Sequence, residues 1–253
     1  LKKVNVWKDK LSGVIYIDSH YVGDDFYKIT EYEKSNYERE CDVKRRFNKY
    51  GKFVIDKKIV DFGCGTGDFL KTVSNKCEFA CGVELSSGFR NKLINEKINC
   101  VESLNDLEDN FLDIIVAFHV FEHLSNPLVI LSQIMRKIKS GGQVVIEVPH
   151  ANDFLLNSSE EFKQFALWSQ HLILHTRESL RRILEYAGFQ NIQIEGVQRY
   201  SLSNHLNWLI NKKPGGHKSH LAILDSDSLN ESYESSLSKI DATDTLVAFA
   251  KVP

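Results

Sequence analysis

The sequence predicts an α/β fold in which buried parallel strands alternate with helices. Three apolar stretches, 59–62, 79–85 and 112–120, each lead into a turn, and further along the chain each is followed by a helical pattern. Strands of a parallel sheet are covered on both faces, so they form short continuous apolar runs. At 253 residues, the chain is long enough for one large domain of this class with its own core.

The first of these strands leads into a glycine-rich turn, in the sequence KIVDFGCGTGDFL at residues 58–70. Its glycines allow a tight turn and a close approach of the backbone to a ligand. A dinucleotide-binding turn needs its third glycine at the sixth position, counted from Gly63. Asp68 stands there instead, and its carboxylate would repel a pyrophosphate. Together with Asp61 at the end of the strand, it favours a cofactor that carries an ammonium group and a sulfonium centre.

This stretch resembles motif I of the class I S-adenosylmethionine-dependent methyltransferases. The resemblance implies a Rossmann-like fold with a mostly parallel seven-stranded sheet, an antiparallel edge strand and helices on both faces. It also implies that motif I holds the amino-acid end of S-adenosylmethionine (SAM). The residues expected to contact the cofactor here are Asp61, Gly63, Cys64, Gly65, Thr66, Gly67 and Phe69.

The second strand, 79–85, ends in an acid, Glu84. A carboxylate at this position can accept hydrogen bonds from both ribose hydroxyls of an adenosyl group. Nucleotide-binding Rossmann domains share this device, so Glu84 supports adenosyl binding without choosing the class. A short third strand is expected at 99–104. The resemblance implies further cofactor contacts from Leu85, Ser103, Leu104, Phe118 and His119.

A fourth strand, 112–120, precedes a turn rich in acid and histidine and then a helix that starts at Pro127, with Asn126 as its N-cap. We expect this helix to stop at Gly141-Gly142 and a fifth strand to occupy 143–149. This order is similar to that of the ubiquinone-pathway O-methyltransferases and of many natural-product and sugar methyltransferases. The resemblance covers roughly residues 55–200.

The turn after the fourth strand holds the candidate catalytic residues. Methyl transfer to a hydroxyl needs an aligned acceptor and a base that removes its proton, and an imidazole titrates close to working pH. Ligands of open α/β sheets bind at the carboxyl ends of the strands, where His119, Glu122 and His123 lie. We expect His123 to be the base, with His119 next, and Glu122 to orient a histidine or bind the acceptor.

Two other interpretations of this turn stay open. Glu122 and His123 could only brace the loop and the methionine end of the cofactor. Alternatively, His119, Glu122 and His123 could bind a divalent metal together with His150, His171 or His175, as a similar turn does in the small-RNA 2′-O-methyltransferases. A histidine replaces the first glutamate of that family here, which would suit Zn²⁺, Fe²⁺ or Mn²⁺ better than Mg²⁺. Of these interpretations, we prefer the one in which this turn binds no metal.

The rest of the chain supplies the sheet edge and an insertion. Thr176 is expected to cap a helix that ends at Gly188, and strands are expected at 192–197 and 245–250. Between those strands, an insertion at about 200–242 gathers cations, imidazoles and aromatics. Such a mixture fits an anionic acceptor, or else a helical hairpin that covers the sheet edge or a dimer contact. The candidate acceptor residues are Arg199, Tyr200, His205 and Trp208 in or beside this insertion, with Tyr37 near the N-terminus.

Residues 1–50 are expected to form a helical cap, or a lid that closes over the site with Tyr32 or Tyr37 facing it, and 51–253 to form the methyltransferase domain. Within this segment, residues 14–17 could form a short strand.

The composition of the chain limits the kinds of binding partner that we expect. A net charge of −2 gives no support for nucleic-acid binding or for an anionic membrane surface as partner. No apolar run approaches the length of a membrane span. The five cysteines are odd in number and include no C-x-x-C pair, which favours reduced thiols in the cytoplasm. We expect a cytoplasmic monomer or homodimer.

These features together predict an enzyme that transfers a methyl group from SAM to an oxygen or nitrogen of a small molecule. A phosphorylated or nucleotide-linked sugar, in surface-glycan or natural-product biosynthesis, is the preferred acceptor. The alternatives are a metal-assisted O-methyltransferase and a module that binds the cofactor without catalysis. Asp68 and Gly67 disfavour a nicotinamide-dependent oxidoreductase.

Overall fold

The computed structural model describes residues 4–17, 36–168 and 170–253. The described chain divides into two compact units. The first, which we call the sheet unit, contains residues 36–146, 182–193 and 248–253. The second, which we call the insertion unit, contains 4–17, 147–181 without residue 169, and 194–247.

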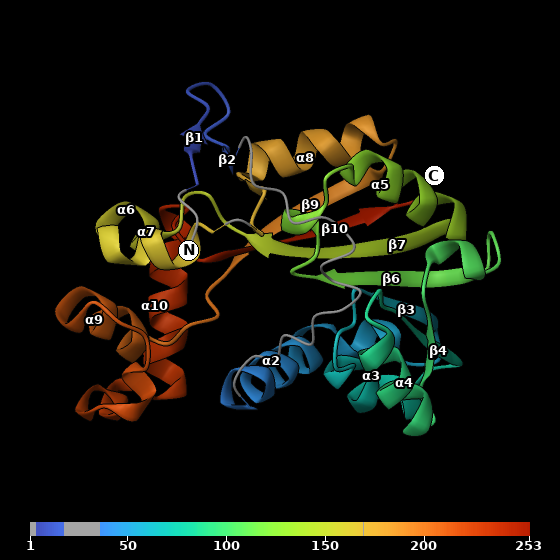
Figure 1. Cartoon of the computed structure of the whole chain (residues 1–253), viewed down its shortest axis with the longest axis horizontal. Coiled ribbons are helices and arrows are strands. Elements are labelled where there is room, and N and C mark those ends of the chain that lie inside the picture. Colours follow the sequence, from blue (N-terminus) through green and yellow to red (C-terminus); the bar gives the residue numbers. More distant parts are fainter. Residues whose placement is uncertain (1–3, 18–35, 169) are drawn as a thin grey trace. The chain divides into compact units, whose positions relative to one another are not determined.

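Seven strands of the described chain form one sheet, in the order β5-β4-β3-β6-β7-β10-β9 (Figure 1). The strands are β3 Lys58–Phe62, β4 Phe79–Val83, β5 Asn99–Val101, β6 Leu112–Phe118, β7 Ile138–Pro149, β9 Gln190–Val197 and β10 Thr245–Lys251. β3 pairs in parallel with β4 and β6, and β4 pairs in parallel with β5. β10 is antiparallel to β7, because Val252 bonds to Gly141 and Gly142 at the start of β7. The predicted fold class, with its antiparallel strand, is confirmed.

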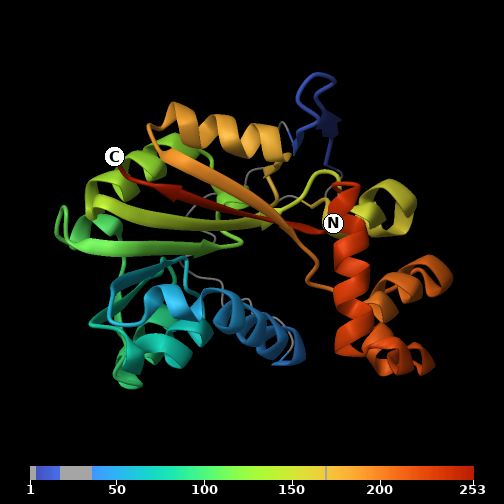
Figure 2. The same ribbon diagram turned by 180° about the vertical axis from the view of Figure 1, so that it is seen from behind.

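Helices cover both faces of the sheet unit. α2 Asn36–Val54, α3 Asp68–Val73 and α4 Ser87–Asn95 lie on one face, and α5 Pro127–Lys137 lies on the other (Figures 1 and 2). The 3₁₀ turns η1 Ser74–Lys76, η2 Leu104–Asp106 and η3 Phe121–His123 join these elements, and α8 Arg177–Tyr186 runs from the insertion unit into the sheet unit. The central strands supply the core, with Ile59, Val60 and Ile115 fully buried.

The helix after the histidine turn ends earlier than predicted. α5 ends at Lys137, and residues 138–142 already belong to β7. Gly141 and Gly142 therefore lie in the sheet and pair with Val252, so the helix end predicted there is wrong. Pro127 does begin α5. However, within the described residues the Asn126 side chain makes no capping hydrogen bond, in contrast to Ser86, which caps α4 by accepting from the backbone N–H of Phe89.

α2 packs into the core of the sheet unit through Tyr50. The Tyr50 ring stacks on Phe118, with centroids 6.0 Å apart, and meets Phe249 edge-on at 5.7 Å. The helix runs without a break past residue 50, where the N-terminal segment was predicted to end. That division and the lid role stay predictions, and Tyr32 lies outside the described residues.

The insertion unit has a small sheet and several short helices. β1 Val6–Lys8, β2 Ile15–Ile17 and β8 Ile173–Leu174 form an antiparallel sheet, so the strand suggested at 14–17 is present and β1 is an additional strand. The other elements are α6 Phe154–Ser158, α7 Glu160–Ala166, α9 Leu202–Asn211, η4 Gly216–Lys218, η5 His220–Leu224 and α10 Asp227–Lys239. Ile15, Leu155, Phe162 and Trp208 belong to its buried apolar cluster.

The turn after α9 is held tightly against that helix. The Asn204 side-chain oxygen accepts the Gly215 N–H at 3.0 Å, and the Asn207 amide donates to the Lys213 carbonyl at 2.7 Å. A Cβ atom on Gly216 would lie 2.1 Å from the Ser203 carbonyl oxygen. These contacts hold the backbone of the turn in one conformation, and only glycine fits at position 216.

We expect Gly216→Ala to lower the free energy of unfolding by roughly 2–4 kcal/mol, because backbone atoms cannot yield to the added methyl group. Urea denaturation followed by circular dichroism measures this. Lys218→Ala is the matched control, since this exposed side chain lies in the same turn and its loss should change stability by less than about 0.5 kcal/mol. A Gly216→Ala protein as stable as the control would contradict the packing described.

Candidate functional site

The glycine-rich turn between β3 and α3 has a left-handed backbone at all three glycines. Gly63 and Gly67 have φ of 72° and 68°, and a Cβ atom on either would lie 2.4 Å from a side chain, Val120 or Leu93 respectively. Gly65 is different, because apart from its two chain neighbours no described residue has an atom within 4 Å of its Cβ position. The turn is thus packed at both ends and open in the middle, where a ligand can approach the backbone.

Glu84, directly after β4, is bonded to this turn. One oxygen of its carboxylate accepts the Gly65 N–H at 2.8 Å, and the other accepts the Ser86 N–H at 2.8 Å. Each oxygen has a second lone pair for a further donor. The sequence analysis assigned Glu84 and the turn to two parts of one cofactor, and the direct bond between Glu84 and Gly65 is an additional finding.

An arginine that the sequence analysis did not single out fixes the loop after β4. Arg90, on α4, donates to the Glu84 and Leu85 carbonyls at 2.8 and 2.7 Å and pairs with Glu102 at 2.9 Å. The same helix also carries Lys92, and no sequence signal distinguishes Arg90 from it. It joins the carboxyl ends of β4 and β5 into one rigid edge.

Asp61 lies on β3 beneath the turn and is only 4% exposed. Burial raises the pKa of its carboxyl to about 7; the Arg46 guanidinium opposes this shift, and the charges of Glu84 and Asp68 add to it. Arg46 comes from α2, where its guanidinium lies 4.3 Å from the centre of the Phe118 ring. A buried carboxyl that titrates near neutrality is poised to gain a cationic partner.

The remaining predicted cofactor residues of the sheet unit surround the turn. Thr66 donates its hydroxyl to Asp68 at 2.7 Å, and Phe69 is buried with its ring edge-on to Phe118. Ser103 caps η2 by accepting the Asn105 N–H. Leu104 is 1% exposed, so it belongs to the core as the structure stands. Cys64 and Leu85 are half-buried.

The histidine turn after β6 brings its three candidate residues together. Glu122 is 1% exposed, and its Oε1 lies 3.1 Å from His119 Nδ1 and 3.9 Å from His123 Nε2. His119 has a left-handed backbone, with φ of 57°, which is uncommon outside glycine and is often found at functional sites. Val120, beside it, packs against Gly63, so the histidine turn and the glycine turn share one edge of the sheet unit.

The predicted acceptor residues differ in exposure. Tyr37, on α2, is 46% exposed, whereas Trp208 and His205, on α9, are 3% and 1% exposed. His205 is stacked on Phe154 and bonded to Tyr233 and Gln198 at 2.9 and 2.8 Å, and burial lowers its pKa to about 4. Trp208 and His205 therefore serve the packing of the insertion unit, and little of either side chain is left to meet an acceptor.

Asp244 organises the half-buried pair Arg199 and Tyr200. Its carboxylate accepts both of their backbone N–H groups at 3.0–3.1 Å, and the Arg199 guanidinium lies over the Tyr200 ring. The charge of Asp244 also acts on Asp153, whose pKa is raised to about 8, mainly by burial. Neither acid was among the predicted site residues, because isolated aspartates in loops carry no recognisable spacing.

The histidines proposed to complete a metal site have local bonds of their own. Nδ1 of His150 lies 2.9 Å from the Thr243 carbonyl, Nδ1 of His171 lies 2.8 Å from the Ala166 carbonyl, and Nδ1 of His175 lies 3.1 Å from the Ser179 hydroxyl. The metal-assisted alternative stays a prediction.

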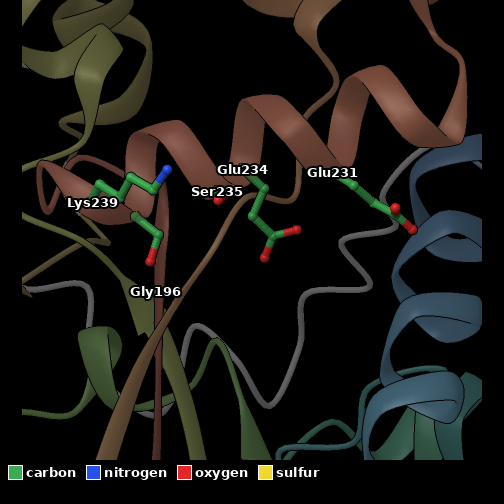
Figure 3. Close-up of a pocket in the computed structure, with 6 residues that line it drawn as sticks. Gly196, Glu231, Glu234, Ser235 and Lys239 are labelled. Carbon is green, nitrogen blue, oxygen red and sulfur yellow. The ribbon is translucent and has the colours of Figure 1, made fainter.

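A groove of about 470 Å³ lies in the insertion unit, and none of the predicted site residues lines it (Figure 3). Its described lining consists of Gly196, Glu231, Glu234, Ser235, Ser238 and Lys239, mostly from α10. The lining is acidic and lacks aromatic rings, so we assign it no part in cofactor binding.

The sheet order, the glycine turn and its acidic partner define the class of protein. A family model described as a methyltransferase domain matches residues 35–194, which is more than half of the chain. The chain belongs to this family, and the resemblance to class I SAM-dependent methyltransferases is confirmed. SAM is the cofactor of this class. Within the described ranges, no helix is both long and apolar enough to span a membrane.

Individual relatives are distant. The chain is 24% identical to an uncharacterized protein of Methanocaldococcus jannaschii, over 64% of this chain and 79% of that one. It is also 24% identical to the tRNA U34 carboxymethyltransferase of Hydrogenovibrio crunogenus, over 60% of this chain and about half of that one, 52%.

Solved structures show the same fold. A SAM-dependent methyltransferase from Archaeoglobus fulgidus superposes with a TM-score of 0.57 at 22% identity, over 84% of this chain and 94% of the other. Phosphoethanolamine N-methyltransferase 2 of Haemonchus contortus, solved with SAM, gives 0.60 at 16% identity, over 98% and 71%. At these identities the likeness concerns the fold alone.

Proposed function

We propose that this chain transfers the methyl group of SAM to an oxygen or nitrogen of a small anionic acceptor. The observation that carries the proposal is the bond between the Glu84 carboxylate and the Gly65 N–H. It joins the ribose-binding acid and the open middle of the glycine turn into one preformed cradle.

Three features of this cradle fit SAM. Asp61, buried beside the turn, is suited to the ammonium group of the cofactor, and Glu84 can accept the ribose hydroxyls. The open space at Gly65 admits the ligand to the backbone. When bound, SAM supplies a methyl group on a positively charged sulfur, so the chain itself need only orient the acceptor and remove its proton.

We assign proton removal to His123. Its side chain is 19% exposed, against 11% for His119, and His119 is the histidine more closely tied to Glu122. The buried Glu122 carboxylate fixes the His119 ring and so the shape of the turn that carries His123. His123 can then accept the proton of an acceptor hydroxyl, with His119 as the second candidate for that role.

The acceptor class rests on the insertion unit. Lys213 and Lys218 are exposed on or next to the turn that Asn204 and Asn207 hold in place, and Lys212, also exposed, pairs with Glu161 at 3.4 Å. A fixed turn that presents lysines suits a phosphate group, as in a phosphorylated or nucleotide-linked sugar. By its name, the Haemonchus contortus relative acts on phosphoethanolamine, which is also a phosphorylated small molecule.

The first test is a calorimetric titration of S-adenosylhomocysteine (SAH) into chelator-treated protein, repeated with Mn²⁺ and in competition with NAD. Micromolar binding without metal, unaffected by NAD, supports the proposal. Binding only with Mn²⁺ would support the metal-assisted alternative, in which His119, Glu122 and His123 bind the metal. Absence of binding in every case would overturn the proposal.

The pH dependence of SAH binding tests Asp61. If the carboxylate binds the SAH ammonium group, protonation of Asp61 competes with binding, and its pKa is about 7. The dissociation constant should therefore be about tenfold higher at pH 6 than at pH 8. Asp61→Asn should bind more weakly and lose this dependence; a wild-type affinity that is flat over this range would remove Asp61 from the ammonium site.

A further inference from the structure

Two thiols of the sheet unit meet behind the glycine turn. Cys64 lies between Gly63 and Gly65, Cys100 lies on β5, and their sulfur atoms are 4.0 Å apart. They meet over Gly82 of the intervening strand β4, where a Cβ atom would lie 2.5 Å from one sulfur and 3.1 Å from the other. The missing side chain at Gly82 leaves the space in which the two sulfurs face each other.

The two thiols are chemically unequal. The hydrogen bond with Cys64 lowers the pKa of Cys100, and the Arg90 guanidinium acts in the same direction, whereas this bond and burial raise the pKa of Cys64. Burial raises the pKa of Cys77 to about 11 and that of Cys81 to about 12. Cys100 is half-buried, so a small oxidant can reach it. The thiolate is the reactive form of a cysteine, so Cys100 is the thiol that we expect to react first with an oxidant.

We propose that hydrogen peroxide oxidises Cys64 and Cys100 to a reversible disulfide and that this disulfide weakens cofactor binding. The Cys100 thiolate attacks one peroxide oxygen, the O–O bond breaks, and one water leaves after protonation, with Cys100 as sulfenic acid. The Cys64 sulfur, as it gives up its proton, attacks that sulfur, the S–O bond breaks, and the departing hydroxide takes up the proton and leaves as a second water. Two thiols are oxidised and one peroxide is reduced to two waters.

The effect on binding follows from the position of Cys64. A disulfide needs sulfurs about 2.0 Å apart, so the pair must close by about 2 Å. Cys64 is flanked by Gly65, whose N–H is bonded to Glu84, and closure pulls this segment toward β5. The regulatory part rests on the proposed function. By reciprocity, bound SAH should also shift the equilibrium between the two thiols and the disulfide toward the thiols.

The experiment treats the full chain with hydrogen peroxide, maps cross-linked peptides by mass spectrometry and titrates SAH before oxidation, after it and after dithiothreitol. We expect a 64–100 cross-link, at least tenfold weaker SAH binding and recovery on reduction. Cys100→Ser should bind SAH normally and be insensitive to peroxide, whereas Cys77→Ser, the matched control, should respond as the wild type does.

The two ideas fail separately. A reduced protein that does not bind SAH overturns the proposed function and the regulatory role, while the peptide map still decides whether the disulfide forms. A map without the 64–100 cross-link overturns the disulfide. A cross-linked protein with unchanged SAH affinity overturns its effect on the cofactor site.

Discussion

Glu84→Ala is expected to weaken SAH binding by about 100-fold or more. The change removes the acceptor proposed for two ribose hydroxyls, and hydrogen bonds to a charged group contribute roughly 1.5–3 kcal/mol each. It also releases the N–H groups of Gly65 and Ser86, which the carboxylate holds at 2.8 Å. Calorimetric titration measures the dissociation constant, and circular dichroism checks that the fold is kept.

Two variants separate charge from shape. Glu84→Gln retains one acceptor oxygen and about the same volume, so its loss of affinity should lie between those of the wild type and Glu84→Ala. Glu78→Ala removes an exposed carboxylate next to the start of the same strand, where it pairs with Lys58, and should leave the affinity unchanged. If Glu84→Ala binds SAH within threefold of the wild type, the ribose site lies elsewhere.

The fold could be predicted because each central strand carries its own signal. An apolar run bounded by a turn identifies β3, β4 and β6 without any knowledge of their partners. The meeting of Glu84 with the glycine turn was also predictable, since β3 and β4 are parallel neighbours. Their register pairs Phe62 with Val83, which places Gly63 and Glu84 at the same edge.

Arginines at this edge could not be predicted. Arg46 lies on a helix with several other cations and Arg90 on one that also carries Lys92, and only tertiary packing selects the ones that face Asp61 or the loop after β4. Gly141-Gly142 misled the prediction for a similar reason. Two glycines favour a helix end locally, but pairing with the distant Val252 places them in a strand.

The residues that bind the acceptor are even harder to predict from the sequence. An aromatic residue on an amphipathic helix fits a ligand site and a core equally well, and Trp208 lies in the core of the insertion unit. His205 likewise has both ring nitrogens within hydrogen-bonding distance of its neighbours, Tyr233 and Gln198. Lys213 and Lys218, after α9, are exposed and can still meet an acceptor, whereas Lys212 pairs with Glu161.

His123→Ala is expected to lower kcat by roughly 10²–10⁴-fold with little change in SAH affinity, because a positioned base contributes about that factor. The measurement is methyl transfer from labelled SAM to an acceptor found by screening phosphorylated and nucleotide-linked sugars, with SAH titration in parallel. If the variant turns over at the wild-type rate, His123 is not the base and only braces the loop.

Variants of His119 and Glu122 test which histidine is the base. His119→Asn removes the imidazole and keeps a residue that tolerates the left-handed backbone at φ 57°, so its loss of rate should be smaller than that of His123→Ala. Glu122→Gln should act through position, lowering kcat modestly, because His123 itself is still present. If His119→Asn instead abolishes turnover while His123→Ala does not, the buried Glu122 carboxylate orients the base itself, and His119 is that base.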